Sequence, residues 1–121
     1  MDLIEISKRI TEKIQLLEKG RGLLHTRATR KATATANYEK ALALTMVKLK
    51  MNAIDQVFGY DMENMPATLI EKVARGLVYA EKLEMELAID EYKSAIVGMN
   101  AIESELNGYQ SINRYLQHES N

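Results

Sequence analysis

Residues 77–117 read LVYAEKLEMELAIDEYKSAIVGMNAIESELNGYQSINRYLQ, and this stretch decides the fold. Residues of one face recur in it at alternating spacings of three and four, which is the heptad pattern of a packed helix seam. The seam consists of Met85, Ala88, Tyr92, Ala95, Met99, Ile102, Leu106, Tyr109, Asn113 and Leu116. The pattern predicts one helix over residues 77–117, a rod of about 60 Å.

A seam of this length needs more cover than one chain of this size provides. A compact protein of 121 residues measures only about 30 Å across, so the helix cannot bury its whole seam within its own chain unless the N-terminal segments run antiparallel along it. Apolar surface would be left over even then. We therefore predict an all-α fold, an elongated helical hairpin or coiled-coil bundle, in a single domain over residues 1–121 that forms a homo-oligomer. Asn113 either fixes the register of this assembly or lies hydrated near a fraying end.

The N-terminal half predicts two helices, over residues 2–24 and 28–56. The apolar face of the first helix is formed by Leu3, Ile6, Ile10, Ile14, Leu17 and Leu24, and that of the second by Tyr38, Leu42, Met46, Leu49 and Ala53. Gly20 and Gly22 weaken helix between them, which favours a break there, although one continuous helix remains open.

The middle of the chain predicts a loop followed by a short helix. Residues 57–65 hold Gly59 and two acids, and we expect them to form the loop. Thr68 and Glu71 have the spacing of a capping box, which predicts a helix over residues 68–75. Gly76 would end this helix.

Residue types and motifs argue against catalysis. The chain has no cysteine and only two histidines, which disfavours a disulfide scaffold, a thiolate metal site, a zinc enzyme and a histidine-based triad. It has no phosphate loop, dinucleotide fingerprint or nucleophile elbow. We expect no enzyme activity, no cofactor and no metal. The start of the sequence lacks a secretory signal and no apolar run is long enough for a bilayer, so we expect a cytosolic protein without membrane contact.

Charge is distributed unevenly along the chain. Residues 19–50 hold eight Lys or Arg and one acid, whereas residues 81–105 hold seven acids and two Lys. One interpretation lays the basic helix beside the acidic helix in an antiparallel hairpin. The other takes the five cations within residues 19–31, repeated around a symmetry axis, as a phosphate or nucleotide pocket. A third interpretation is nonspecific nucleic-acid binding. The lack of interleaved aromatic residues and the sequence pI of 6.1 argue against it.

The candidate ligand-binding residues combine cations for phosphates with tyrosines that would stack a base. They are Arg21, Arg27, Arg30, Lys31, Arg75, Tyr109, Arg114 and Tyr115. The tyrosines have an alternative interpretation as edges of the core.

Residues 66–70 and 73–76, Ala88, residues 92–95, Gln110 and Arg114 together form a further pattern. With residues 37–42 upstream, this pattern resembles a family of small helical proteins encoded by phages and prophages of Gram-positive bacteria. The resemblance covers residues 37–116, and residues 58–63 form a longer loop than the family's. It implies an early-region product encoded near replication, recombination or host-takeover genes, without an established activity.

These observations predict a non-enzymatic phage early protein that acts by binding in the host cytosol. The first hypothesis is an anti-defence protein that sequesters a cyclic nucleotide, or another small phosphorylated signal of the host, in pockets between subunits. The alternative is an inhibitor or adaptor that binds a host protein or phage machinery for replication, recombination or defence. In that case the acidic face over residues 81–105 would mimic nucleic acid, with nucleic-acid contact also possible.

Overall fold

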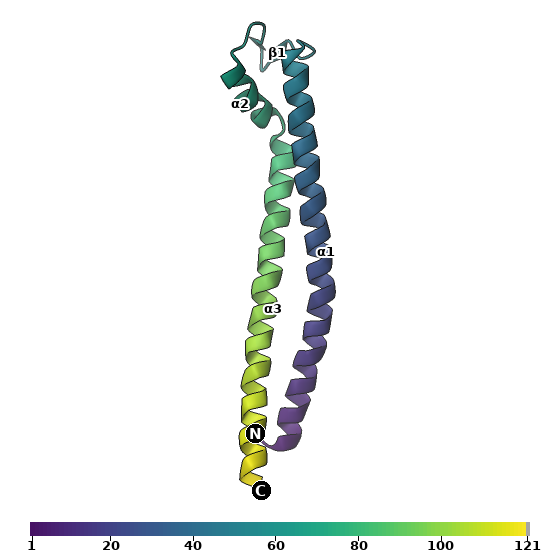
Figure 1. Cartoon of the computed structure of the whole chain (residues 1–121), viewed down its shortest axis with the longest axis vertical. Helices are drawn as coiled ribbons and strands as arrows, with labels where there is room; N and C mark the ends of the chain where they lie inside the picture. The colour runs from purple at the N-terminus through teal and green to yellow at the C-terminus, as the bar shows by residue number, and fades with distance from the viewer. Residues whose placement is uncertain (121) are drawn as a thin grey trace. The chain divides into compact units, whose positions relative to one another are not determined.

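The computed structural model describes residues 1–120 and is mostly helical (Figure 1). Its elements are α1 (Leu3–Lys50), β1 (Gln56–Val57), β2 (Tyr60–Asp61), α2 (Ala67–Leu77) and α3 (Tyr79–Ser120). The predicted helical class is therefore confirmed at this level, and the two short strands add a hairpin that was not predicted. The chain divides into two compact units, each described below by itself: unit 1 (residues 1–29 and the described residues from Asp90 onward) and unit 2 (Arg30–Ile89).

Helix α1 is continuous, so the prediction of two helices with a break at Gly20 and Gly22 is wrong. Each glycine costs a helix about 1 kcal/mol relative to alanine, which is little against the packing of the whole element. Gly20 also lies against α3, because a Cβ atom there would come within 3.2 Å of the Met99 Cγ atom. The glycine therefore serves the packing of the helix instead of interrupting it.

Helix α1 ends at Lys50, six residues before the predicted end at Gln56. Asn52 adopts a left-handed conformation with φ of 57°. Its N–H donates to the Leu49 carbonyl at 3.3 Å, and the Ala53 N–H donates to the Lys48 carbonyl at 2.9 Å. This is the Schellman pattern, for which asparagine is one of the few suitable residues besides glycine. Ala53, predicted on the apolar face of the helix, consequently lies beyond it.

The predicted capping box of α2 is wrong. The helix begins at Ala67, directly after Pro66, and no side-chain cap hydrogen bond forms at its start. Pro66 has φ of −57°, and its carbonyl accepts the Leu69 N–H at 2.9 Å. Pro66 thus occupies the N-cap position, two residues before Thr68. Thr68 lies inside the helix and cannot act as its cap.

The predicted end of α2 at Arg75 is also wrong, since the helix runs through Gly76 to Leu77. Gly59 is the only glycine in a left-handed conformation within residues 1–120, so Gly76 does not terminate the helix. Only Val78 separates α2 from α3, which spans residues 79–120 where the sequence predicted 77–117. The Val78 N–H still donates to the Ala74 carbonyl at 3.1 Å, so the backbone bends there without losing this bond.

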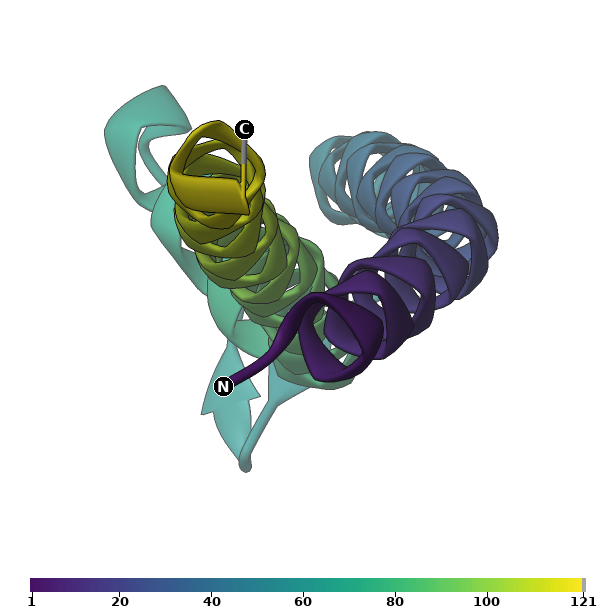
Figure 2. The same cartoon turned by 90° about the horizontal axis from the view of Figure 1, so that it is seen from below.

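In unit 1, the first part of α1 runs antiparallel to the last part of α3. Lys13 pairs with Glu105, and Arg27 pairs with Glu91, so rising numbers on α1 meet falling numbers on α3. The N-terminal end of α1 and the C-terminal end of α3 therefore lie at the same end of this unit (Figures 1 and 2). Every seam residue of unit 1, from Tyr92 to Leu116, is half-buried. The predicted face of α3 is thus the one that packs.

The apolar face predicted for the start of α1 holds except at one position. Ile6 and Leu17 are buried, but Ile14 is 42% exposed. Lys13 occupies the packed face of α1 instead. It lies three residues after Ile10 and four before Leu17, and it is half-buried. The prediction for Ile14 is wrong because a lysine with an ion-pair partner can occupy a packed position.

Unit 2 has a small apolar core where α1 ends, the hairpin turns and α2 begins. Its centre is formed by Leu49, Val57 and Ala74, all buried. The side chains packed around it are Leu42, Met46, Ile54, Met62, Met65, Ile70, Val73 and Leu77. Three methionines in this set fill an irregular space between short elements, a use to which their flexible side chains are suited.

Candidate interaction surface

Two of the cations expected to bind phosphate instead form ion pairs with acids of α3. In unit 1, Arg27 Nη1 lies 2.5 Å from Glu91 Oε2. In unit 2, Arg30 Nη2 lies 2.6 Å from Glu84 Oε1. The interpretation that the basic segment lies beside the acidic helix is therefore confirmed within each unit. These guanidinium groups already have carboxylate partners within the chain.

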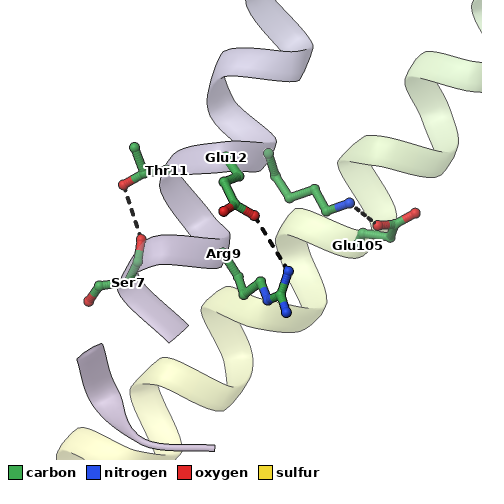
Figure 3. A network of polar contacts seen from close by, with 6 residues as sticks. Ser7, Arg9, Thr11, Glu12 and Glu105 are labelled. Carbon is green, nitrogen blue, oxygen red and sulfur yellow. Dashed lines mark hydrogen bonds and ion pairs between the residues drawn. The ribbon is translucent and has the colours of Figure 1, made fainter. Parts of the chain in front are cut away.

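A third pair joins the same helices nearer the ends of the chain. Lys13 forms an ion pair with Glu105, and Figure 3 shows the Glu105 carboxylate directed toward α1, where Arg9 and Glu12 form a further pair on the helix surface. The hydrogen bond to Glu105 is the main cause that holds the pKa of Lys13 above its ordinary value. The pair keeps a charged lysine on the packed face of α1.

Arg75, which sequence alone left without a structural role, connects α2 to α1 within unit 2. Its Nη1 donates to the hydroxyl of the buried Tyr38 at 3.1 Å, and its Nη2 pairs with Glu71 at 2.5 Å. The bond to Glu71, and after it the neighbouring Tyr38, hold the pKa of Arg75 above its ordinary value. The Lys82 ammonium lies 5.8 Å from the Tyr38 ring centre. Arg75 is thus committed to contacts inside the chain.

The remaining candidate residues do not converge. Arg21 is exposed, and Lys31 is half-buried. Arg114 Nε donates to the Gln110 carbonyl of its own helix at 3.4 Å, beside the exposed Tyr115.

Tyr109 is half-buried on the seam. It follows Glu91, the partner of Arg27, by 18 residues on α3, a distance of about 27 Å along the helix. Within unit 1, the tyrosines and Arg27 therefore cannot share a pocket.

Residues 1–120 contain no group of three or more His, Asp or Glu side chains placed to hold a metal ion. None of the helices in the described chain combines the length and the apolar character needed to cross a bilayer.

An apolar ridge on α3 was missed by the sequence analysis. Tyr79, Leu83 and Leu87 lie four residues apart, so they form one row on the helix surface. All three side chains are exposed, and Leu83 is 58% exposed. The spacing of four residues between these side chains is visible in the sequence. The ridge was missed because the heptad seam of the same helix was taken as its only apolar face.

A second apolar surface of unit 2 is a groove between α1 and α2. It has a volume of about 380 Å³ and is lined by Ala43, Met46, Val47, Lys50, Ala67 and Ile70. Lys50 is the only charged residue in this lining. The exposed side chains of Leu44 and Leu69 come from the same two helices. The groove therefore suits an apolar occupant with a negative charge at its edge.

Comparison of the chain with models of protein families, with curated proteins and with solved structures gives no match. The resemblance to phage-encoded helical proteins thus stays a prediction.

Proposed function

We propose that the protein is a non-enzymatic adaptor or inhibitor that binds a protein partner on the ridge formed by Tyr79, Leu83 and Leu87. The observation that carries this proposal is the exposure of three large apolar side chains in one row. Apolar and aromatic side chains in a continuous row are typical anchors for a partner helix or a partner groove. Exposure of these side chains to water is unfavourable in free energy, and this cost is offset only when another molecule covers them.

The charge around the ridge supports a basic partner surface. Glu86 is exposed on the turn of α3 between Leu83 and Leu87, and Glu84 precedes it. Glu84 is already paired with Arg30, which leaves Glu86 as the carboxylate for a partner. The partner is accordingly a protein whose apolar contact surface has a basic rim. Such a surface is common on proteins that also bind nucleic acid, in line with an acidic mimic.

The binding of a cyclic nucleotide has less support. A phosphate at Arg27 or Arg30 would have to displace Glu91 or Glu84, and Arg75 is held by Glu71 and Tyr38. The proposal keeps two further expectations of the sequence, namely that the protein forms a homo-oligomer of helical hairpins and acts as a phage product in the host cytosol.

Leu83→Glu tests the ridge, and Leu23→Glu is the matched control. Leu23 lies in unit 1 and is 48% exposed, so the same substitution places a charge at a similarly exposed leucine elsewhere. Each tagged protein is produced in its natural host cells, and the proteins that it captures are quantified by mass spectrometry. We expect one stoichiometric partner with the wild type and with Leu23→Glu, and its loss with Leu83→Glu. Equal capture by both variants, or a co-purified nucleotide in place of a protein, would contradict the proposal.

A further inference from the structure

The turn of the β1–β2 hairpin carries an aromatic residue in an unfavourable conformation. Val57 pairs with Tyr60, so Phe58 and Gly59 form a two-residue turn. Their φ angles are 52° and 85°, as a type I′ turn requires. Glycine, asparagine and aspartate adopt this conformation readily, whereas a bulky side chain such as phenylalanine rarely does. The chain thus holds Phe58 where its backbone conformation is disfavoured.

Phe58 gains little burial within its own chain, because its side chain is 87% exposed. Tyr60, on the other side of the turn, is also exposed. Strained residues that persist without local benefit are typical of positions that serve binding. Both rings are therefore exposed at the turn of the hairpin, which we call the aromatic tip.

The base of this tip is acidic. Asp55, Asp61 and Glu63 line a hollow of about 360 Å³ beside the hairpin. The Glu63 N–H donates to Asp61 Oδ1 at 2.9 Å, which leaves the other carboxylate oxygen of Asp61 available to a partner. A molecule that receives the aromatic tip thus also meets negative charge.

The groove between α1 and α2 has the complementary properties. Its walls are apolar, its volume suffices for an aromatic ring, and Lys50 supplies a cation at its edge. We infer that the groove of one copy of this chain receives Phe58 from the turn of a second copy, with Lys50 facing the acidic residues at the base of that turn. Because turn and groove belong to the same unit, a two-fold axis lets each copy donate one turn and receive one.

The area that such an exchange buries is that of a weak, reversible dimer. A buried Phe or Tyr removes roughly 150–250 Å² from water. Two copies contribute four such rings, roughly 600–1,000 Å² when all are covered. The groove walls add a smaller area, so the total of roughly 800–1,200 Å² corresponds to a weak, reversible interface. This inference rests on the self-association in the proposed function and assigns the surface that produces it.

Sedimentation velocity of the full chain, from low micromolar to several hundred micromolar, tests the inference with three variants. Phe58→Asn removes the ring and places in the turn a residue that accepts a positive φ. Val47→Glu places an acid in the groove, where the acidic turn would be repelled. Val97→Glu is the control, since Val97 is 67% exposed in unit 1 and Val47 is 53% exposed.

We expect the wild type to self-associate, and Phe58→Asn and Val47→Glu each to weaken the association constant by about tenfold or more. Val97→Glu should leave it unchanged. At a concentration where the wild type is monomeric, Phe58→Asn should melt at the same or a higher temperature than the wild type, so that unfolding cannot account for the loss. A monomeric wild type, or association constants within twofold of the wild type for Phe58→Asn and Val47→Glu, would overturn the inference.

Disulfide trapping gives a second readout, because the chain has no cysteine of its own. A tagged Phe58→Cys chain mixed with an untagged Val47→Cys chain should form a mixed dimer, and Val97→Cys in place of Val47→Cys should not. Equal trapping by Val47→Cys and Val97→Cys would contradict the contact. Leu83 lies in neither the turn nor the groove lining, so partner capture that Leu83→Glu leaves unchanged would overturn the proposed function and leave this inference standing.

Discussion

Lys13 shows how one residue can hold a place that an apolar pattern assigns to its neighbour. Ile10 and Leu17 fix the packed face of α1, and both Lys13 and Ile14 lie near that face by spacing alone. Lysine can bury its methylene stem while its ammonium reaches a partner at the rim. The partner, Glu105, is 92 residues away in the sequence, so no local pattern could select Lys13 over Ile14.

The pair between Lys13 and Glu105 predicts a pH dependence of stability. Since the pKa of Lys13 is raised in the folded state, the contribution of the pair is complete below the unfolded value of about 10.4. It is lost as the pH rises through the folded value. The melting temperature of the wild type minus that of Lys13→Met, measured by circular dichroism, should therefore stay constant near neutral pH and fall above about pH 10.4.

Lys8→Met is the control for this comparison, because Lys8 is exposed and has no ion pair within residues 1–120. The same difference for Lys8→Met should change much less over that range. A difference for Lys13→Met that grows above pH 10.4 would show that the pair has the opposite effect.

The ends of the helices were the least predictable feature at the scale of elements. The seam residues of α3 in unit 1 were identified from spacing, and all are half-buried. The end of α1 depends on the left-handed Asn52, and the asparagine signal was present in the sequence but was not used. The hairpin was missed because its strands have two residues each and its turn is Phe-Gly instead of the usual Asn-Gly.

The two glycines of α1 lead to a prediction at this scale. A Cβ atom at Gly22 would meet nothing within 4 Å, whereas at Gly20 it would approach Met99 Cγ to 3.2 Å. Gly22→Ala should raise the free energy of unfolding by about 0.5–1 kcal/mol, because alanine favours helix. Gly20→Ala should gain less or lose stability, since Met99 must move. Urea denaturation at one protein concentration provides the measurement, and a larger gain for Gly20→Ala would contradict the packing of Gly20 against α3.

At the scale of the whole molecule, the opposite charges of α1 and α3 form contacts within the chain, whereas part of the apolar surface is left exposed. The opposite charges of residues 19–50 and 81–105 were visible in the sequence, and two of the resulting ion pairs join α1 to α3. The sequence did not show whether the arginines pair with acids of α3 or bind phosphate, because this depends on which carboxylate each guanidinium group meets in the fold. In unit 2, apolar side chains of the ridge, the turn and the groove stay exposed, and the proposals above assign them to contacts with other protein chains.

Native mass spectrometry of the protein, gently isolated from the cells that produce it, tests most directly whether other protein chains cover these surfaces. We predict masses in which the chain is accompanied by a second copy, by a protein partner, or by both, without a bound nucleotide. A bare single chain at every concentration, or a chain that retains a small phosphorylated molecule and no protein, would contradict the account.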